Sequence, residues 1–202
     1  MPNEIRGSGA FVAAMVVWFA VACAAGASGR VAALAPPWPQ VMIGAITLVL
    51  VLLGALHPGL RAWLAQVNLR GFVAFHVTRF VGIAFLVLSA RGELSRAWAI
   101  PAGWGDIVVA LGALLIALIM RDPQARSALL GFWNVVGFAD IVLVVVTAAR
   151  TGLGDPASMA PLFHFPMSLV PTFIVPFVIA SHLLVFWRLD RRASWPSAPR
   201  KS

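Results

Sequence analysis

Residues 71–90 form an apolar run that is long enough to cross a bilayer, yet it carries His76 and Arg79 in its interior. An arginine near the centre of the hydrocarbon costs about 2.5–3.5 kcal/mol on insertion scales. Arg79 is therefore expected to face protein or water and to have a partner. Because His76 and Arg79 are three residues apart, a helix places both side chains on one face.

Composition places the whole chain in a membrane. It is 61% hydrophobic and 11% charged, with a mean hydropathy of +0.93. The predicted fold class is all-α, a polytopic membrane helix bundle in contact with lipid. The net charge of +8 does not indicate nucleic-acid binding, because the basic residues lie in short loops and in the tail. The single cysteine, Cys23, excludes an internal disulfide and a cysteine-based metal cluster.

The chain is expected to form one membrane domain over residues 1–202, with six transmembrane helices. Their predicted bounds are about 10–28, 41–57, 71–90, 99–120, 128–149 and 166–187. The first span also fits a cleaved signal peptide, because it follows a short polar lead and ends in small residues. Within this span, Ala20, Ala24 and Ser28 are four residues apart, a small-residue face suited to close helix packing.

Residues 58–70, between the second and third spans, are amphipathic. One helical face carries the apolar side chains of Leu60, Trp63, Leu64 and Val67. The polar side chains off that face are Arg61, Asn68 and Arg70. This pattern predicts a short helix that lies in the membrane interface, and a plain loop is the alternative.

Basic residues are distributed unequally between the two sides of the predicted bundle. Ten lie on the side of the termini and four on the other, and Arg79 inside the membrane completes the 15. Positive charge favours the cytoplasmic side, so both termini and the basic tail of residues 188–202 are predicted to be cytoplasmic. All but one of the basic residues are arginine and tyrosine is absent. This usage indicates a GC-rich bacterial genome and hence a multi-pass protein of the cell inner membrane.

Depth along the predicted helices sorts the polar side chains into two layers, at about 1.5 Å of rise per residue. The midplane layer is Arg79, Asp106 and Asp140. The inner-leaflet layer is His76, Asn134 and His182.

Spans four and five share a short pattern. Residues 103–109, GWGDIVV, resemble residues 137–143, GFADIVL, and each segment has an acid three residues after a glycine. The two spans run in opposite directions, so they are expected to present Asp106 and Asp140 to one central point. Inverted repeats place sites at the midplane of many transporters. A chance match in an Ala/Gly/Val-rich chain is the alternative.

Span six contains three prolines at five-residue spacing, Pro166, Pro171 and Pro176. The last two each remove a helix hydrogen bond and bend the helix. The freed carbonyls must be satisfied or line a cavity. One face is predicted to carry a polar track across the span, formed by Ser168, Thr172, Val175, Ile179 and His182. The alternative is that these prolines only shape packing.

Arg79 with Asp106 or Asp140 is open to two interpretations. It is either a structural ion pair that holds three helices together, or a substrate or proton site to which Asn134 and Thr172 also belong. One arginine cannot neutralise two carboxylates, so one acid is expected to carry a proton, as acids in proton-carrying sites do.

His76 and His182, at equal depth, allow three interpretations. They are two ordinary core histidines, or the axial ligands of a b-type haem, which needs one imidazole from each of two facing helices. With Asp106 or Asp140 they are instead ligands of a divalent metal such as zinc or iron. No HExxH, GxSxG, Walker or Cys-x-x-Cys motif is present, so no enzyme class is predicted.

Four segments of the chain are HVTRFVGIAFLVL, IPAGWGDIVVA, FWNVVGFADIVLV and FPMSLVPTFIVPFVIASHLL. They resemble segments of a group of small bacterial multi-pass membrane proteins whose activity is not established. The resemblance covers roughly residues 71–184. It implies a multi-helix membrane fold and nothing about activity.

Three function classes remain. The favoured one is binding or transport of a small molecule or a proton, with Arg79 fixing an anionic group and Asp106 or Asp140 cycling a proton. The first alternative is a b-type cytochrome that transfers electrons through a haem on His76 and His182. The second alternative is an intramembrane hydrolase with a divalent metal on histidine and aspartate ligands.

Overall fold

The computed structural model describes residues 2–119 and 127–193, and every regular element within these ranges is helical. The elements are α1 (Pro2–Ala27), α2 (Trp38–Leu56), α3 (Pro58–Gln66), α4 (Leu69–Phe75), η1 (His76–Val81), α5 (Gly82–Ala90), α6 (Arg96–Ile119), α7 (Ser127–Gly154), η2 (Ala157–Phe163), η3 (Val170–Ile174) and α8 (Val175–Ala193). The short elements η1 and η2 are 3-10 helices, and η3 is a π-helix. Most of the predicted turn at residues 121–127 and the end of the predicted tail lie outside the described residues.

Within the described residues, six stretches are long and apolar enough to cross a membrane, which confirms the predicted all-α bundle. They are Gly9–Ala27, Trp38–Leu56, Leu69–Ala90, Arg96–Ile119, Ala128–Gly154 and Val170–Arg191. Large apolar side chains are exposed along these helices, among them Val16, Leu48, Trp104 and Phe132, as expected for surfaces that contact lipid.

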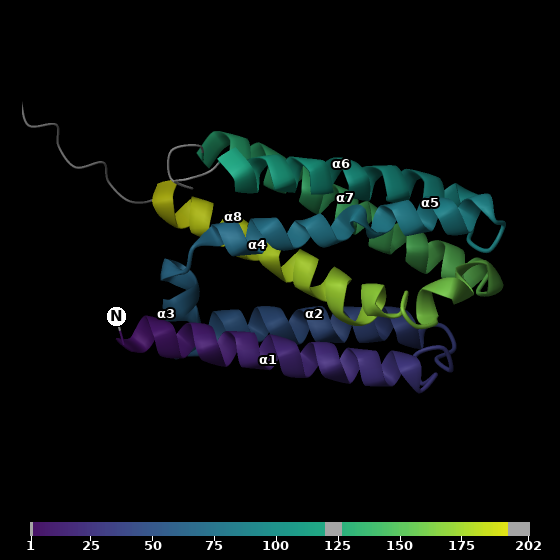
Figure 1. Cartoon of the computed structure of the whole chain (residues 1–202), viewed down its shortest axis with the longest axis horizontal. Coiled ribbons are helices and arrows are strands. Elements are labelled where there is room, and N and C mark those ends of the chain that lie inside the picture. The colour runs from purple at the N-terminus through teal and green to yellow at the C-terminus, as the bar shows by residue number, and fades with distance from the viewer. Residues whose placement is uncertain (1, 120–126, 194–202) are drawn as a thin grey trace, which may run out of the picture.

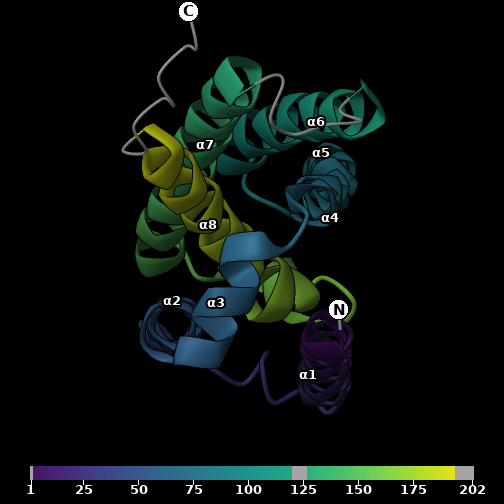
Figure 2. The same ribbon diagram turned by 90° about the vertical axis from the view of Figure 1, so that its left-hand side faces the viewer.

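The sixth span is the centre of the bundle (Figures 1 and 2). Of its residues 61% are buried, compared with 11% in the first span and 6% in the second. Helix α8 packs against α2, α4 and α7, whereas α1 packs mainly against η3 and α3. Helix α1 begins and α8 ends at one end of the bundle, called here the near end; the opposite end is the far end (Figure 1).

Helix α3 lies across the near end and confirms the helix predicted at residues 58–70 (Figures 1 and 2). The His57 side chain accepts a hydrogen bond from the Leu60 amide and caps the helix at its start. The Arg188 guanidinium donates to the carbonyl oxygens of Leu64 and Val67, at 2.6 and 3.0 Å. Arg188, predicted to begin the tail, is therefore a buried part of α8, which continues to Ala193.

The packing face of α1 differs from the predicted small-residue face. Ala20, Ala24 and Ser28 are exposed. The face turned to the bundle carries Phe11, Met15, Trp18, Ala22 and Gly26. Aromatic rings bury far more area than methyl groups, so the face that holds Phe11 and Trp18 is the one that docks.

Spans three and six are not continuous α-helices. The third is interrupted by the 3-10 helix η1, and the sixth begins with the π-helix η3 rather than at Pro166, which lies in a turn. Pro171 and Pro176 have no amide hydrogen to donate, so the first turns of this span cannot keep the α-helical hydrogen-bond pattern. The predicted loop at residues 151–165 instead holds the last turn of α7 and the helix η2.

Two apolar cores flank the midplane. The core nearer the near end includes Val73, Ala113, Leu130, Trp133 and Val185. The core nearer the far end includes the side chains of Phe85, Trp98, Val144, Met159 and Val178. Along α6 and α7, Asp106 and Asp140 fall between the residues of these two cores, so the charged groups lie in the middle of the bundle.

Candidate functional site

Arg79 is the hub of the buried polar cluster, and 1% of its surface is exposed. Its Nε donates to Asp106 Oδ1 at 2.6 Å, its Nη2 donates to Asp140 Oδ2, and its Nη1 donates to the Gly137 carbonyl at 3.1 Å. The predicted ion pair is therefore confirmed, and both acids take part in it. One guanidinium between two carboxylates leaves a formal charge of −1, which a single bound proton neutralises.

The 3-10 helix η1 presents Arg79 to its partners. In a 3-10 helix, side chains three residues apart lie directly above one another, so His76 and Arg79 share one face. Directly after η1, the backbones of α5 and α6 are in contact. A Cβ added to Gly82 would lie 2.9 Å from the Asp106 Cβ, and one added to Gly103 would lie 2.8 Å from the Gly82 carbonyl oxygen. This close approach brings Arg79 within reach of Asp106.

Glycines of the repeated pattern in spans four and five make room for the cluster. Gly137, three residues before Asp140, gives its carbonyl to Arg79. A Cβ added to Gly137 would lie 2.7 Å from the His182 Cε1. A Cβ added to Gly105 would collide with the Asp140 carboxylate, whose side chain is 20% exposed. As predicted, the two segments bring their acids to one point.

His76 and His182 lie in contact on the near-end side of the ion pair, as predicted. Their ring centroids are 4.3 Å apart, and the ring planes are tilted by 59°. His76 Nε2 is 2.9 Å from Ser181 Oγ, and His182 Nδ1 is 2.8 Å from Asn134 Oδ1. The Trp133 ring packs edge-on against His76 with a centroid distance of 4.9 Å. Asn134 therefore lies at the level predicted for it.

Thr172 lies in the π-helix η3 and is held by hydrogen bonds away from the ion pair. Its hydroxyl donates to the Ser168 carbonyl at 2.6 Å, and its own carbonyl accepts a hydrogen bond from Trp18 Nε1 at 3.1 Å. Ser168 packs against Gly26 of α1. The predicted polar track from these residues to His182 assumed regular α-helical spacing, and the π-helix departs from that spacing. One extra residue turns the rest of a helix by about 100°.

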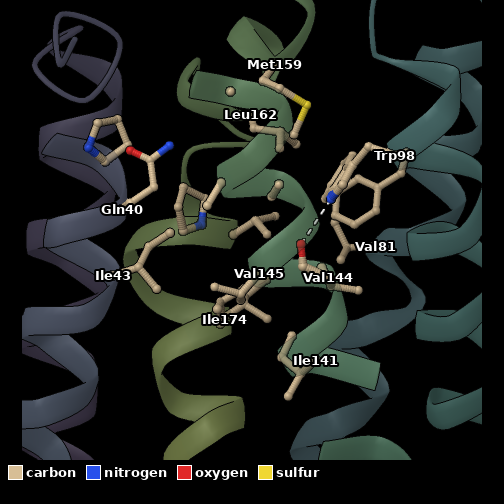
Figure 3. Close-up of a pocket in the computed structure, with 18 of the residues that line it drawn as sticks. Gln40, Ile43, Val81, Trp98, Ile141, Val144, Val145, Met159, Leu162 and Ile174 are labelled. Carbon is tan, nitrogen blue, oxygen red and sulfur yellow. Dashed lines mark hydrogen bonds between the residues drawn. The ribbon is translucent and has the colours of Figure 1, made fainter. Parts of the chain in front are cut away.

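A cavity of about 70 Å³ leads from the ion pair toward the far end. Arg79 and Asp106 line it at the midplane, and Gln40 lines it at the start of α2. Apolar side chains form most of the rest, including Ile43, Phe85, Ile141, Val145, Ile174 and Val178. Figure 3 shows Gln40 and Ile43 on one side of this cavity and Trp98 on the other. Trp98 Nε1 donates to the Val144 carbonyl at 3.1 Å and is held in place.

A second, wider hollow of about 360 Å³ adjoins this cavity at the far end. It is called here the vestibule, and residues 32–36 and the helix η2 contribute to its walls. The vestibule and the cavity share four lining residues, which are Pro39, Gln40, Gly152 and Phe163. Gln40 Oε1 is buried there without a hydrogen-bond partner among the described residues. A polar atom thus marks the junction between the two spaces.

The histidine pair does not fit a haem. An iron between two imidazoles would hold their coordinating nitrogens about 4 Å apart, since each iron–nitrogen bond is about 2 Å. The ring centroids would then lie farther apart than those nitrogens, whereas here they are 4.3 Å apart in tilted contact. No slot for a porphyrin separates the rings. Over residues 2–119 and 127–193, no three His, Cys, Asp or Glu side chains are grouped as metal ligands, so the hydrolase alternative gains no support.

Two members of the site were not predicted from the sequence: Ser181, which holds His76, and Trp133, which packs on the same ring. The repeated pattern drew attention to Gly137, but not to the role of its backbone carbonyl. The one hint for Ser181 in the sequence was its position directly before His182. Gln40, in a loop-to-helix junction, becomes visible as a site residue only when the cavity and the vestibule are seen to meet there.

A family model described as Domain of unknown function (DUF8737) matches residues 36–190. The match includes every residue of the ion pair and of the histidine pair, together with Gln40, and it leaves out α1. No curated protein and no solved structure matches the chain.

Proposed function

The chain belongs to the DUF8737 family, and we propose that its buried site binds a small anionic molecule together with a proton and carries them across the membrane. The observation that carries this proposal is the cavity between the vestibule and the ion pair. A charged cluster that served only to hold helices together would need no cavity leading to it. Here Arg79 and Asp106 of the ion pair themselves line the cavity.

The proton and the anion are coupled through Arg79. In the structure three of the five N–H groups of Arg79 donate to protein acceptors. Asp106 lines the cavity beside Arg79, so a ligand that binds to the guanidinium Nε takes the place of Asp106 Oδ1. Protonation of the Asp106 carboxylate frees the guanidinium Nε for the ligand. When the ligand leaves, Asp106 loses its proton and returns to Arg79. The formal charge of the site is then −1 both with and without the bound proton and anion, so transfer adds no further charge to a region of low dielectric.

The walls of the cavity define the class of ligand. Between Gln40 and Arg79 they are mainly aliphatic and aromatic. An occupant that carried several polar groups would leave them without hydrogen-bond partners, at a cost in affinity. The ligand that fits is a small carboxylate with an apolar body, oriented with its anionic group toward Arg79.

Access to the cavity can be tested by thiol labelling. In a Cys23→Ser background, the variants Val145→Cys and Val142→Cys place a thiol on the same helix, three residues apart. Val145 lines the cavity, whereas Val142 is 40% exposed on the outside of the bundle, where lipid lies. A charged, membrane-impermeant thiosulfonate added to intact cells is expected to label only Val145→Cys, because a thiol in hydrocarbon stays protonated. Equal labelling of the two variants, or none at Val145→Cys, would contradict the proposal.

Ligand class can be tested with propionate and 1-propanol, which share a short apolar chain and differ in charge. Both are small enough for a cavity of about 70 Å³. Binding to the purified protein is measured by calorimetry. Propionate is expected to bind, and Asp106→Asn is expected to raise its affinity at least tenfold, because the carboxylate no longer competes for Arg79. Propanol should not respond to this change. The control Glu93→Gln removes a charge from the exposed loop between α5 and α6 and should leave propionate binding unaltered.

A further inference from the structure

Hydrogen bonds determine which nitrogen of each buried histidine carries the proton. Asn134 Nδ2 donates to the His182 carbonyl at 3.2 Å, so Asn134 Oδ1 is the acceptor for His182 Nδ1. Ser181 Oγ donates its one hydrogen to the Val178 carbonyl at 2.9 Å, so it accepts from His76 Nε2. His182 is therefore protonated on Nδ1 and His76 on Nε2.

The other nitrogen of each ring carries a lone pair that accepts no hydrogen bond from the described residues. His76 Nδ1 and His182 Nε2 are both buried and make no hydrogen bond within the described part of the chain. The exposed fractions of the two residues are 1% and 0%. Buried acceptors are nearly always paired, so two unpaired lone pairs on touching rings need an explanation. A proton bound to the unpaired nitrogen of one ring would turn that nitrogen into an N–H donor. The unpaired nitrogen of the other ring would then be available as its acceptor.

Formal charge balance allows one proton on the pair and opposes two. Arg79 from η1 shares a helical face with His76, and Asp106 from α6 and Asp140 from α7 are bound to Arg79. On α8, the Arg188 guanidinium is bound to carbonyl oxygens of the α3 segment. Arg79 with its two ionised acids has a formal charge of −1, which one imidazolium balances. A second imidazolium at a ring distance of 4.3 Å would be repelled by the first.

We infer that His76 and His182 form a single-proton site on the near-end side of the ion pair, to which the Asp106 proton passes. This inference rests on the proposed function and adds the next position of the proton. In the step, the O–H bond of the Asp106 carboxyl breaks, an N–H bond forms on one imidazole, and the Asp106 carboxylate returns to Arg79. The formal charge of the five groups is zero before and after the transfer. Gly137 lies between Arg79 and His182: its carbonyl accepts from Arg79, and a Cβ added to it would lie 2.7 Å from the His182 Cε1.

Nitrogen-15 NMR of histidine-labelled protein tests the site directly. The chain has four histidines, and His57→Ser with His164→Gln leaves only the pair, with Ser chosen because residue 57 caps α3. At alkaline pH, His76 should show the Nε2–H tautomer and His182 the Nδ1–H tautomer. On acidification, the total imidazolium signal should rise to one per chain and stop there. Two imidazolium groups per chain, or none while the protein remains folded, would overturn the inference.

Charge balance gives a second readout that does not depend on transport. At a pH where half of the pairs carry a proton, Asp106→Asn should lower the imidazolium fraction at least tenfold, because the negative charge that it balances is gone. Glu93→Gln, on the exposed α5–α6 loop, is the control and should have no effect. An unchanged fraction in Asp106→Asn would refute the link between the two positions. Thiol labelling and propionate binding report on the cavity alone, so the proposed function can stand if this inference fails.

Discussion

Arg79 and His182 contact the same glycine from two sides. Arg79 Nη1 donates to the Gly137 carbonyl at 3.1 Å, and a Cβ on Gly137 would lie 2.7 Å from the His182 Cε1. The midplane ion pair and the histidine pair are thus separated by the thickness of one backbone. Any side chain at position 137 would force the two layers apart.

Gly137→Ala is expected to destabilise the protein by about 1–3 kcal/mol, the usual cost of overpacking a close-packed interior. The added methyl group would also lie 3.0 Å from the Val109 Cγ1 and has no open space to enter. The measurement is the midpoint of unfolding in detergent. Gly131→Ala on the same helix is the control, because its Cβ would meet only Leu189, at 3.6 Å. That variant should be neutral or slightly stabilising, since alanine favours helix; equal losses in both variants would argue against the contact.

Arg79→Met is expected to reduce the yield of folded protein strongly, because it leaves the buried Asp106 and the partly buried Asp140 carboxylate without their cation. Breaking a buried ion pair on one side typically costs about 3–5 kcal/mol. The triple variant Arg79→Met, Asp106→Asn, Asp140→Asn removes all three charges and should fold better than the single variant. Size-exclusion chromatography of fluorescently tagged protein gives the comparison. A triple variant that is worse than the single one would show that the cluster contributes more than charge balance.

Two buried serines, Ser181 in the sixth span and Ser168 just before it, are expected to respond differently to replacement by alanine. Ser181→Ala removes the acceptor of His76 Nε2 and should cost about 1–3 kcal/mol, as an unsatisfied buried donor does. Ser168 Oγ is buried and has no partner among the described residues. Ser168→Ala should therefore be neutral or stabilising in the same unfolding assay. If the two variants lose equal stability, the Ser181–His76 hydrogen bond is not the reason.

Sidedness follows from the arrangement of the helices. Helix α1 begins and α8 ends at the near end (Figure 1), and the sequence predicts the excess of basic residues on the side of the termini, so this end is expected to face the cytoplasm. In a Cys23→Ser background, an impermeant maleimide added to intact cells should label Glu93→Cys in the α5–α6 loop. It should label Arg61→Cys on α3 only after the cells are opened. The reverse pattern would place the vestibule on the cytoplasmic side.

Much of the polar cluster could be predicted from the sequence, because charge in hydrocarbon is so costly. That cost alone required a partner for Arg79, and equal depth selected Asp106 and Asp140. Depth also grouped His76, Asn134 and His182, which the structure brings together. These inferences need only the rise per residue of a helix and the thickness of a membrane. Neither quantity depends on how the helices pack.

Other features depend on contacts between distant segments and could not be read locally. The residues of η1, HVTRFV, contain no proline or glycine that would signal a 3-10 turn. The turn lies where α5 and α6 approach closely at Gly82 and Gly103. Thr172 was assigned to the face of His182 by regular α-helical spacing, and the π-helix η3 breaks that spacing. Which face of α1 docks likewise depended on the partners of Trp18, not on α1 itself.

The cavity has an electrical consequence. It opens through the vestibule at one end and stops at Arg79 and Asp106 in the middle of the bundle. A proton that reaches Asp106 from the vestibule therefore crosses only part of the transmembrane voltage. A full crossing is worth about 2.3 kcal/mol per 100 mV. The cell's own membrane potential, acting on that fraction, thus helps to set how often Asp106 is protonated, so the loading of the site should respond to voltage as well as to pH.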